Sequence, residues 1–93
     1  MINNNKIPIP FIYPFMLRVL MQLYDKPQTI HELNESAKVQ NSADAVKKLR
    51  DKGINIVSEW IINPVKENRR SIVKYFIHPE SKKLSLKTIN KNR

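Results

Sequence analysis

The chain has 93 residues, which is enough for one small domain with a thin hydrophobic core. It contains no cysteine, which excludes a disulfide framework and a thiolate metal site and fits a reducing cytoplasm. The formal net charge is +9, and residues 38–93 supply all of it with 14 basic and five acidic side chains. Such a localised positive field favours a polyanionic partner, nucleic acid before an anionic membrane surface.

Residues 1–11 are expected to form an N-terminal arm. A polar, asparagine-rich start leads into Ile7–Pro10, where alternate prolines require an extended backbone. The apolar run Ile7–Leu17 is too short to span a bilayer, and it lacks a small-residue cleavage site. We therefore expect no membrane span and no signal peptide.

Residues 12–23 predict the first helix. Apolar side chains recur there at steps of three and four residues, which is typical of a helix with one buried face. Pro14 would occupy the first turn, where its missing N–H does no harm. We expect this helix to begin at about Tyr13 and to end at Lys26-Pro27.

A capping box predicts the start of a short second helix. The Thr29 hydroxyl can accept a hydrogen bond from the Glu32 N–H, and the Glu32 carboxylate can accept one in return from the Thr29 N–H. The helix is expected to end at about Ser36 or Ala37. Residues 38–41 would then form a four-residue turn.

The third helix is expected over residues 42–53. Asn41 or Ser42 can cap it, and Asp44 lies in its first turn, where the helix dipole favours an acid. Gly53 is the only glycine in the chain and lies where helices often end in a left-handed residue. The helical periodicity turns Val46 and Leu49 inward, flanked by Ser42 and Ala45, and leaves Asn41, Asp44, Lys47, Lys48 and Asp51 on the opposite face.

A β-hairpin is expected after the third helix. The apolar period changes from 3.6 to 2 over residues 54–62, a polar loop follows at 63–70, and a second strand runs over 71–78 to Pro79. We expect Trp60 to be a core aromatic residue of this hairpin, with base stacking as the less favoured role. The face of the second strand that should point inward consists of Val73, Tyr75 and Ile77.

This order of elements predicts an α+β fold, a winged helix-turn-helix with a three-helix core and a two-stranded β-hairpin wing. The domain would span residues 12–79, between the arm 1–11 and a basic C-terminal tail 80–93 that is either a short extra helix or a frayed end. In such a fold the third helix lies in the major groove of DNA, and the wing loop 63–70 lies on the backbone or in the minor groove.

The candidate DNA contacts lie on the turn, the third helix and the wing. Lysine can contact guanine or phosphate, aspartate can accept a hydrogen bond from cytosine, and serine can serve either role. The helix charges can equally form i,i+4 pairs, Asp44–Lys48 and Lys47–Asp51, and the two acids would repel phosphate. Arg50 lies at the border of the packed face. The expected DNA-binding residues are Lys38, Gln40, Asn41, Ser42, Asp44, Lys47, Lys48, Lys66, Asn68, Arg69 and Arg70.

The segments LRDKGINIVSEWI and RRSIVKYFI lie on either side of a polar basic turn. Together these two segments resemble small winged helix-turn-helix proteins of bacteriophages and other mobile elements. The resemblance implies DNA binding as a transcriptional regulator, excision factor or replication accessory in a bacterial or phage-infected cell. It also implies that two copies often pair, as a homodimer, on repeated or palindromic sites. The residues that carry it are Leu49, Arg50, Gly53, Ile56, Trp60 and Tyr75, within residues 12–79.

The leading hypothesis is a non-enzymatic protein that binds double-stranded DNA. The alternative is a winged-helix protein-interaction module, an inhibitor or adaptor of a host protein that does not bind DNA. RNA binding lacks an RNP-like aromatic pattern, and membrane binding lacks a basic amphipathic helix. The isolated His31 and His78 and the lone glycine lead us to expect no metal, no cofactor and no catalysis.

Overall fold

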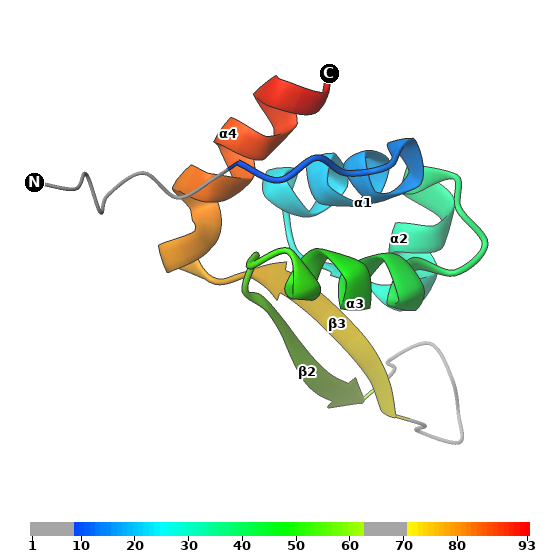
Figure 1. Ribbon diagram of the computed structural model, residues 1–93. Coiled ribbons are helices and arrows are strands. Elements are labelled where there is room, and N and C mark those ends of the chain that lie inside the picture. Colours follow the sequence, from blue (N-terminus) through cyan, green and yellow to red (C-terminus); the bar gives the residue numbers. More distant parts are fainter. Residues whose placement is uncertain (1–8, 63–70) are drawn as a thin grey trace, which may run out of the picture.

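The structure, a computed structural model, describes residues 9–62 and 71–93. Three helices pack on one face of a small antiparallel sheet, and a fourth helix lies at the end of the molecule opposite the hairpin (Figure 1). The elements in chain order are α1 (Pro14–Asp25), β1 (Gln28–Thr29), α2 (Ile30–Ala37), α3 (Ser42–Asp51), β2 (Ile56–Ile62), β3 (Ser71–Ile77), the 3-10 turn η1 (Pro79–Ser81) and α4 (Lys82–Asn92).

Helix α1 begins and ends where its prolines predict. Tyr13 is the extended N-cap, Pro14 is the first helical residue, and the Leu17 N–H donates to the Tyr13 carbonyl at 3.0 Å. The chain is extended again at Lys26, because the following Pro27 disfavours a helical conformation there.

Helix α2 starts with the predicted capping box. The Glu32 N–H donates to the Thr29 hydroxyl at 3.2 Å, and the Thr29 N–H donates to the Glu32 carboxylate at 2.8 Å. The hydrogen bond from the Thr29 backbone stabilises the charged carboxylate and lowers the pKa of Glu32. The helix ends as Lys38 enters the left-handed region with φ of 56°.

Both ends of α3 are fixed by local hydrogen bonds. The Asn41 side chain accepts from the Asp44 N–H at 3.1 Å. At the other end Gly53 adopts φ of +97°, its N–H donates to the Arg50 carbonyl, and the Ile54 N–H donates to the Leu49 carbonyl. This is a Schellman motif, so the helix proper ends at Asp51 and the rest of the predicted span is its C-terminal cap.

The hairpin is confirmed, but the sheet has a third strand that the sequence did not predict. β1 pairs with β3, which gives the strand order β1-β3-β2 and leaves β2 at an edge. Gln28 anchors β1, because its buried amide donates to the Gln22 carbonyl and accepts from the Ser36 hydroxyl. These partners hold two residues in the sheet that no local pattern marks as a strand.

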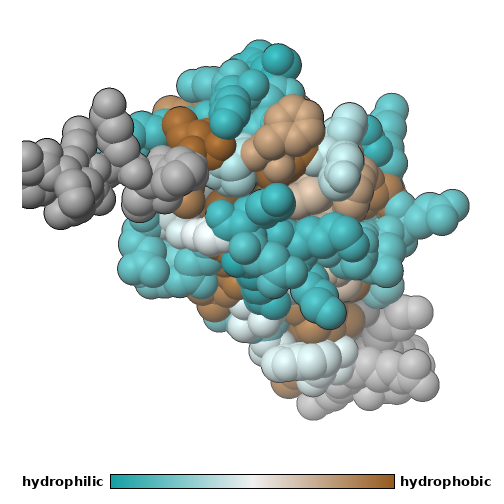
Figure 2. Space-filling model, viewed as in Figure 1, coloured by the Kyte–Doolittle hydropathy of each residue, from teal (hydrophilic) through white to brown (hydrophobic). Residues whose placement is uncertain are grey.

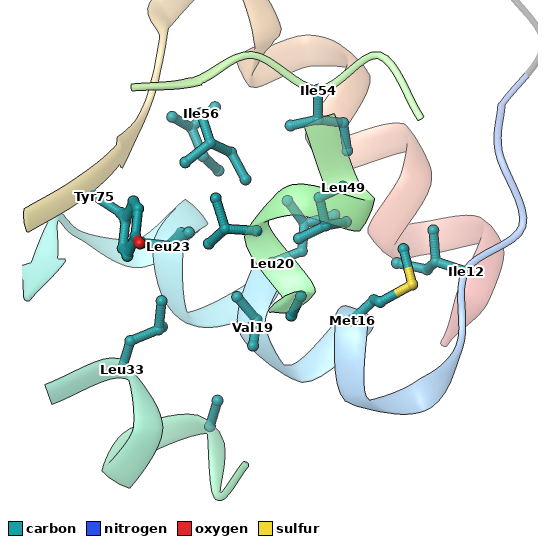
Figure 3. Packing of buried hydrophobic residues seen from close by; sticks show 14 of the residues in the cluster. Ile12, Met16, Val19, Leu20, Leu23, Leu33, Leu49, Ile54, Ile56 and Tyr75 are labelled. Carbon is teal, nitrogen blue, oxygen red and sulfur yellow. The ribbon is translucent and has the colours of Figure 1, made fainter. Parts of the chain in front are cut away.

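The core lies between α1, α2, α3 and the base of the hairpin. Figure 3 shows Leu20 of α1 beside Leu49 of α3, and Leu23 of α1 beside Tyr75 of the sheet, with Ile56 next to them. The predicted inward face of β3 is confirmed by its buried members. Further buried apolar residues are Ile12, Met16, Val19, Leu33, Ala37, Ala45, Val46, Ile54, Ile77 and Ile89.

The prediction that Trp60 is a core residue is wrong. Its side chain is 72% exposed, whereas Ile56 on the same strand is 2% exposed. The physical reason is the length of the two strands. β2 and β3 extend beyond the helices that cover the base of the hairpin (Figure 1).

Of the two options for the basic C-terminal segment, the structure shows the helix. Residues Ser85, Thr88 and Ile89 of α4 are buried, and α4 packs on α1. The Asn92 side chain accepts from the Ile12 N–H and donates to the Pro10 carbonyl, both at 3.0 Å. The end of α4 thereby holds the start of the described chain. Within residues 9–62 and 71–93 no helix has both the length and the apolar character needed to cross a membrane.

Candidate nucleic-acid interface

Helix α3 presents one side to solvent because the core holds the other. Ala45, Val46 and Leu49 are almost completely buried, while Lys47 and Lys48 are exposed. A helix fixed by one apolar face cannot rotate, so its polar face has a defined direction. The structure therefore brings together the predicted helix residues, with the exception of Ser42.

The two lysines of α3 differ in their partners. The Lys48 ammonium lies 2.9 Å from the Asp44 carboxylate, an exposed i,i+4 pair as predicted. The second expected pair, between Lys47 and Asp51, is not formed, since no such contact is present between described residues. Of these two lysines, Lys47 is therefore the one that a phosphate or base edge can meet without first displacing a carboxylate of that helix.

The prediction that Ser42 contacts DNA is wrong in this conformation. The side chain has no exposed surface, and its hydroxyl has no partner among the described residues. Ser42 lies three and four residues before Ala45 and Val46, on the same buried side of the helix. Its N–H donates to the Asn34 side chain at 2.8 Å, which ties the start of α3 to α2.

The turn before α3 leaves its predicted contact residues at the surface. Lys38, Gln40 and Asn41 are exposed. The side-chain oxygen of Asn41 already accepts a hydrogen bond from the Asp44 N–H and so caps α3. Only the side-chain N–H₂ of Asn41 remains to donate to a ligand. Lys38 and Gln40 thus lie at the end of α3 where the helix dipole adds a positive field.

Arg50 joins α3 to the hairpin, a role that its border position in the helix did not reveal. Its Nε donates to the Ile56 carbonyl at 2.8 Å, and its guanidinium lies 6.0 Å from the centre of the Tyr75 ring. Arg50 therefore bridges α3 and both long strands. This contact ties the base of the hairpin to α3.

The predicted wing contacts lie outside the described residues. Lys66, Asn68, Arg69 and Arg70 belong to the loop 63–70, which connects the end of β2 to the start of β3. Its two flanking residues, Ile62 and Ser71, are opposite each other in the ladder. Among residues 9–62 and 71–93, no cluster of three or more His, Asp or Glu side chains could hold a metal ion.

Comparisons with known proteins agree on the architecture. No family model and no curated protein matches the sequence. Among solved structures, the proposed transcriptional regulator TA0346 from Thermoplasma acidophilum is 21% identical, with a TM-score of 0.60 over 78% of this chain and 74% of that one. ZitR, a zinc-responsive MarR family member from Lactococcus lactis, is 18% identical, with a TM-score of 0.60 over 98% of this chain and 65% of its own.

A second ZitR structure, of a cysteine-to-serine mutant in complex with DNA, is also similar. It is 18% identical with a TM-score of 0.55, over 96% of this chain and 67% of that one. Likeness at this level of identity establishes the fold. The protein has an α+β winged-helix fold, as its order of elements predicted.

Proposed function

We propose that this protein binds double-stranded DNA as a regulator or as an accessory of recombination or replication. The observation that carries the proposal is that α3 has one buried side and one exposed, basic side. Its apolar side is locked in the core, and its opposite side offers Lys47 and Lys48 to solvent. A recognition helix needs this arrangement to enter a major groove while the domain stays folded.

The proposal assigns different roles to helix and wing. Asp44 neutralises part of the Lys48 charge, so α3 contributes selectivity more than attraction. The loop 63–70 carries three bases and would supply contacts to the backbone or the minor groove. The exposed Lys38 and Gln40 would reach phosphates beside the start of α3.

Salt dependence tests this function directly. Contact with about five phosphates predicts a slope of roughly −4 to −5 for log K against log salt concentration on duplex DNA. Lys47→Ala should make this slope less negative by about 1. Lys87→Ala, on the exposed side of α4, removes the same charge away from α3 and should leave binding unchanged. A slope near zero for the unmodified protein excludes the proposal.

A protein-interaction module is the second candidate, favoured by exposed apolar side chains. Phe11 is 71% exposed and Tyr13 is 63% exposed, next to the partly buried Phe15 on which Tyr13 stacks. A stoichiometric protein partner, captured from nuclease-treated lysate by a chain without DNA affinity, would favour this candidate. DNA affinity in the salt titration would favour the first.

Pairing of two copies is a further part of the proposal. A homodimer on a palindromic site would separate two α3 helices by about 34 Å, one turn of DNA. Sedimentation of the protein with a duplex carrying two half-sites would distinguish one bound copy from two.

A further inference from the structure

Trp60 projects from the same face of the sheet as the core residues. In the β2–β3 ladder Ile56 is opposite Ile77, and Trp60 is opposite Val73. Opposed residues of antiparallel strands share a face, and alternate residues of one strand share it too. Since Ile56 and Ile77 are buried in the core, Trp60 points to the side of the sheet on which the helices pack.

The helices end before they reach Trp60. Exposure along this face of β2 rises from 2% at Ile56 to 72% at Trp60 and 62% at Ile62. Two large apolar side chains thus stand side by side on one strand without cover from the described residues. Removing a large apolar surface from water is favourable, so these two side chains favour contact with a partner.

The charges around this face favour an anionic partner. Glu59 and Lys74 are opposite each other on the other face of the hairpin. On the Trp60 side, the guanidinium of Arg50 lies 6.0 Å from the centre of the Tyr75 ring. No described residue of this face is acidic: it consists of Ile56, Ser58, Trp60, Ile62, Ser71, Val73, Tyr75 and Ile77.

The surface also lies beside the recognition helix. Figure 2 shows hydrophilic side chains over α3 and paler to hydrophobic ones over the outer part of β2, on one side of the molecule. A duplex that approaches α3 from this side would also meet the hairpin.

We propose that Trp60, with Ile62 beside it, packs against the sugars and base edges of the duplex next to the groove that receives α3. This inference rests on the proposed DNA binding and adds an apolar contact to it. Proteins that widen or bend a minor groove use apolar side chains in this way, and an indole also has an N–H to donate to a phosphate.

Pairing with a second copy of the chain fits this strand less well. β2 is an edge strand whose outer backbone groups are unpaired by the sheet, so it could add a strand from another molecule. Glu59 is the central residue of β2. A centred two-fold pairing would place Glu59 against its own copy, and like charges directly opposite destabilise a ladder.

The test uses the fact that Trp60 is the only tryptophan in the chain. A fluorescein-labelled mixed-sequence duplex reports binding by anisotropy, and quenching of Trp60 emission by acrylamide, a neutral probe, reports its exposure. We expect saturating duplex to reduce quenching severalfold. The Trp60→Ala variant should raise Kd about tenfold, the loss expected for one aromatic anchor, and leave the salt slope unchanged. Trp60→Phe should restore most of the affinity.

Phe11→Ala is the matched control, because Phe11 is as exposed as Trp60 and lies on the N-terminal segment. It should bind DNA like the unmodified protein. If the duplex binds while quenching of Trp60 and the Kd of Trp60→Ala stay unchanged, the inference is wrong and the proposed function stands. If no duplex binds, the proposed function fails as well. Protection of Trp60 that rises with protein concentration alone would assign the surface to a second copy and overturn the inference.

Discussion

The Lys48 ammonium lies 2.9 Å from the Asp44 carboxylate on the solvent side of α3. Both side chains are nearly half exposed, so water and salt weaken the pair. It nevertheless holds an acid at the centre of the surface proposed to face DNA. The net effect of Asp44 on binding therefore depends on whether it reads a base.

Asp44→Asn distinguishes the two roles. If Asp44 only neutralises Lys48 and repels phosphate, the variant should bind all duplexes more tightly, with a salt slope steeper by up to about 1. If Asp44 accepts a hydrogen bond from cytosine, affinity for a selected site should instead fall relative to random DNA. Glu80→Gln makes a comparable substitution at η1 and should change neither quantity. Equal binding by Asp44→Asn and the unmodified protein at every salt concentration would contradict both roles.

Arg50→Ala should weaken the contact between α3 and the hairpin. The variant loses the hydrogen bond to the Ile56 carbonyl and the contact with Tyr75. We expect the free energy of unfolding in urea to fall by about 1–2 kcal/mol. Lys52→Ala removes a neighbouring exposed cation and should have little effect on stability. Equal losses from the two variants would show that the Arg50 contact does not stabilise the fold.

The capping box of α2 predicts a specific pH dependence. The pKa of Glu32 is lowered below its ordinary value of 4.5 by hydrogen bonds from Thr29. A carboxyl group with a lowered pKa in the folded state stabilises the fold above its ordinary pKa, and this contribution is lost as the pH falls through the lowered value. Glu32→Gln should therefore be less stable than the unmodified protein at pH 7 in urea unfolding, and the difference should shrink as the pH falls through the lowered pKa. A stability difference of the same size at pH 7 and below the lowered pKa would contradict this origin.

Asn92→Ala should release the start of the described chain from α4. Its side chain bonds to the Ile12 N–H and to the Pro10 carbonyl. We expect the free energy of unfolding to fall by about 1–2 kcal/mol and the Ile12 amide to lose protection from hydrogen exchange. Asn90→Ala changes an exposed residue of the same helix and should preserve that protection. An unchanged exchange rate at Ile12 in Asn92→Ala would show that other contacts hold this segment.

Helix boundaries were predictable because their causes are local. Pro14, the Thr29–Glu32 box and Gly53 each act through bonds to residues at most five positions away. Strand β1 has no such signal. Gln28 is held by hydrogen bonds to Gln22 and Ser36, which belong to two different helices, and by its pairing with Tyr75 of β3.

The errors at the candidate interface have two physical causes. The alternation of side chains along β2 correctly places Trp60 on the core side of the sheet. That alternation does not show where the helices that cover the sheet end. Ser42 has the hydrogen-bonding chemistry of a DNA contact, but the helical period turns it toward Val46 and the core. At a helix surface, position on the helix outweighs residue type.

The hairpin is attached to the domain at its base, so a small rotation there produces a larger displacement at its far end. Six residue steps separate Ile56 from Ile62, which is about 20 Å at the usual strand rise. A tilt of about 10° at the Arg50 contact would displace the far end by about 3.5 Å over this length. If the protein binds DNA as proposed, small repacking beneath Tyr75 would shift its alignment with two neighbouring grooves. Residues remote from any nucleotide would then govern which duplex shapes it accommodates.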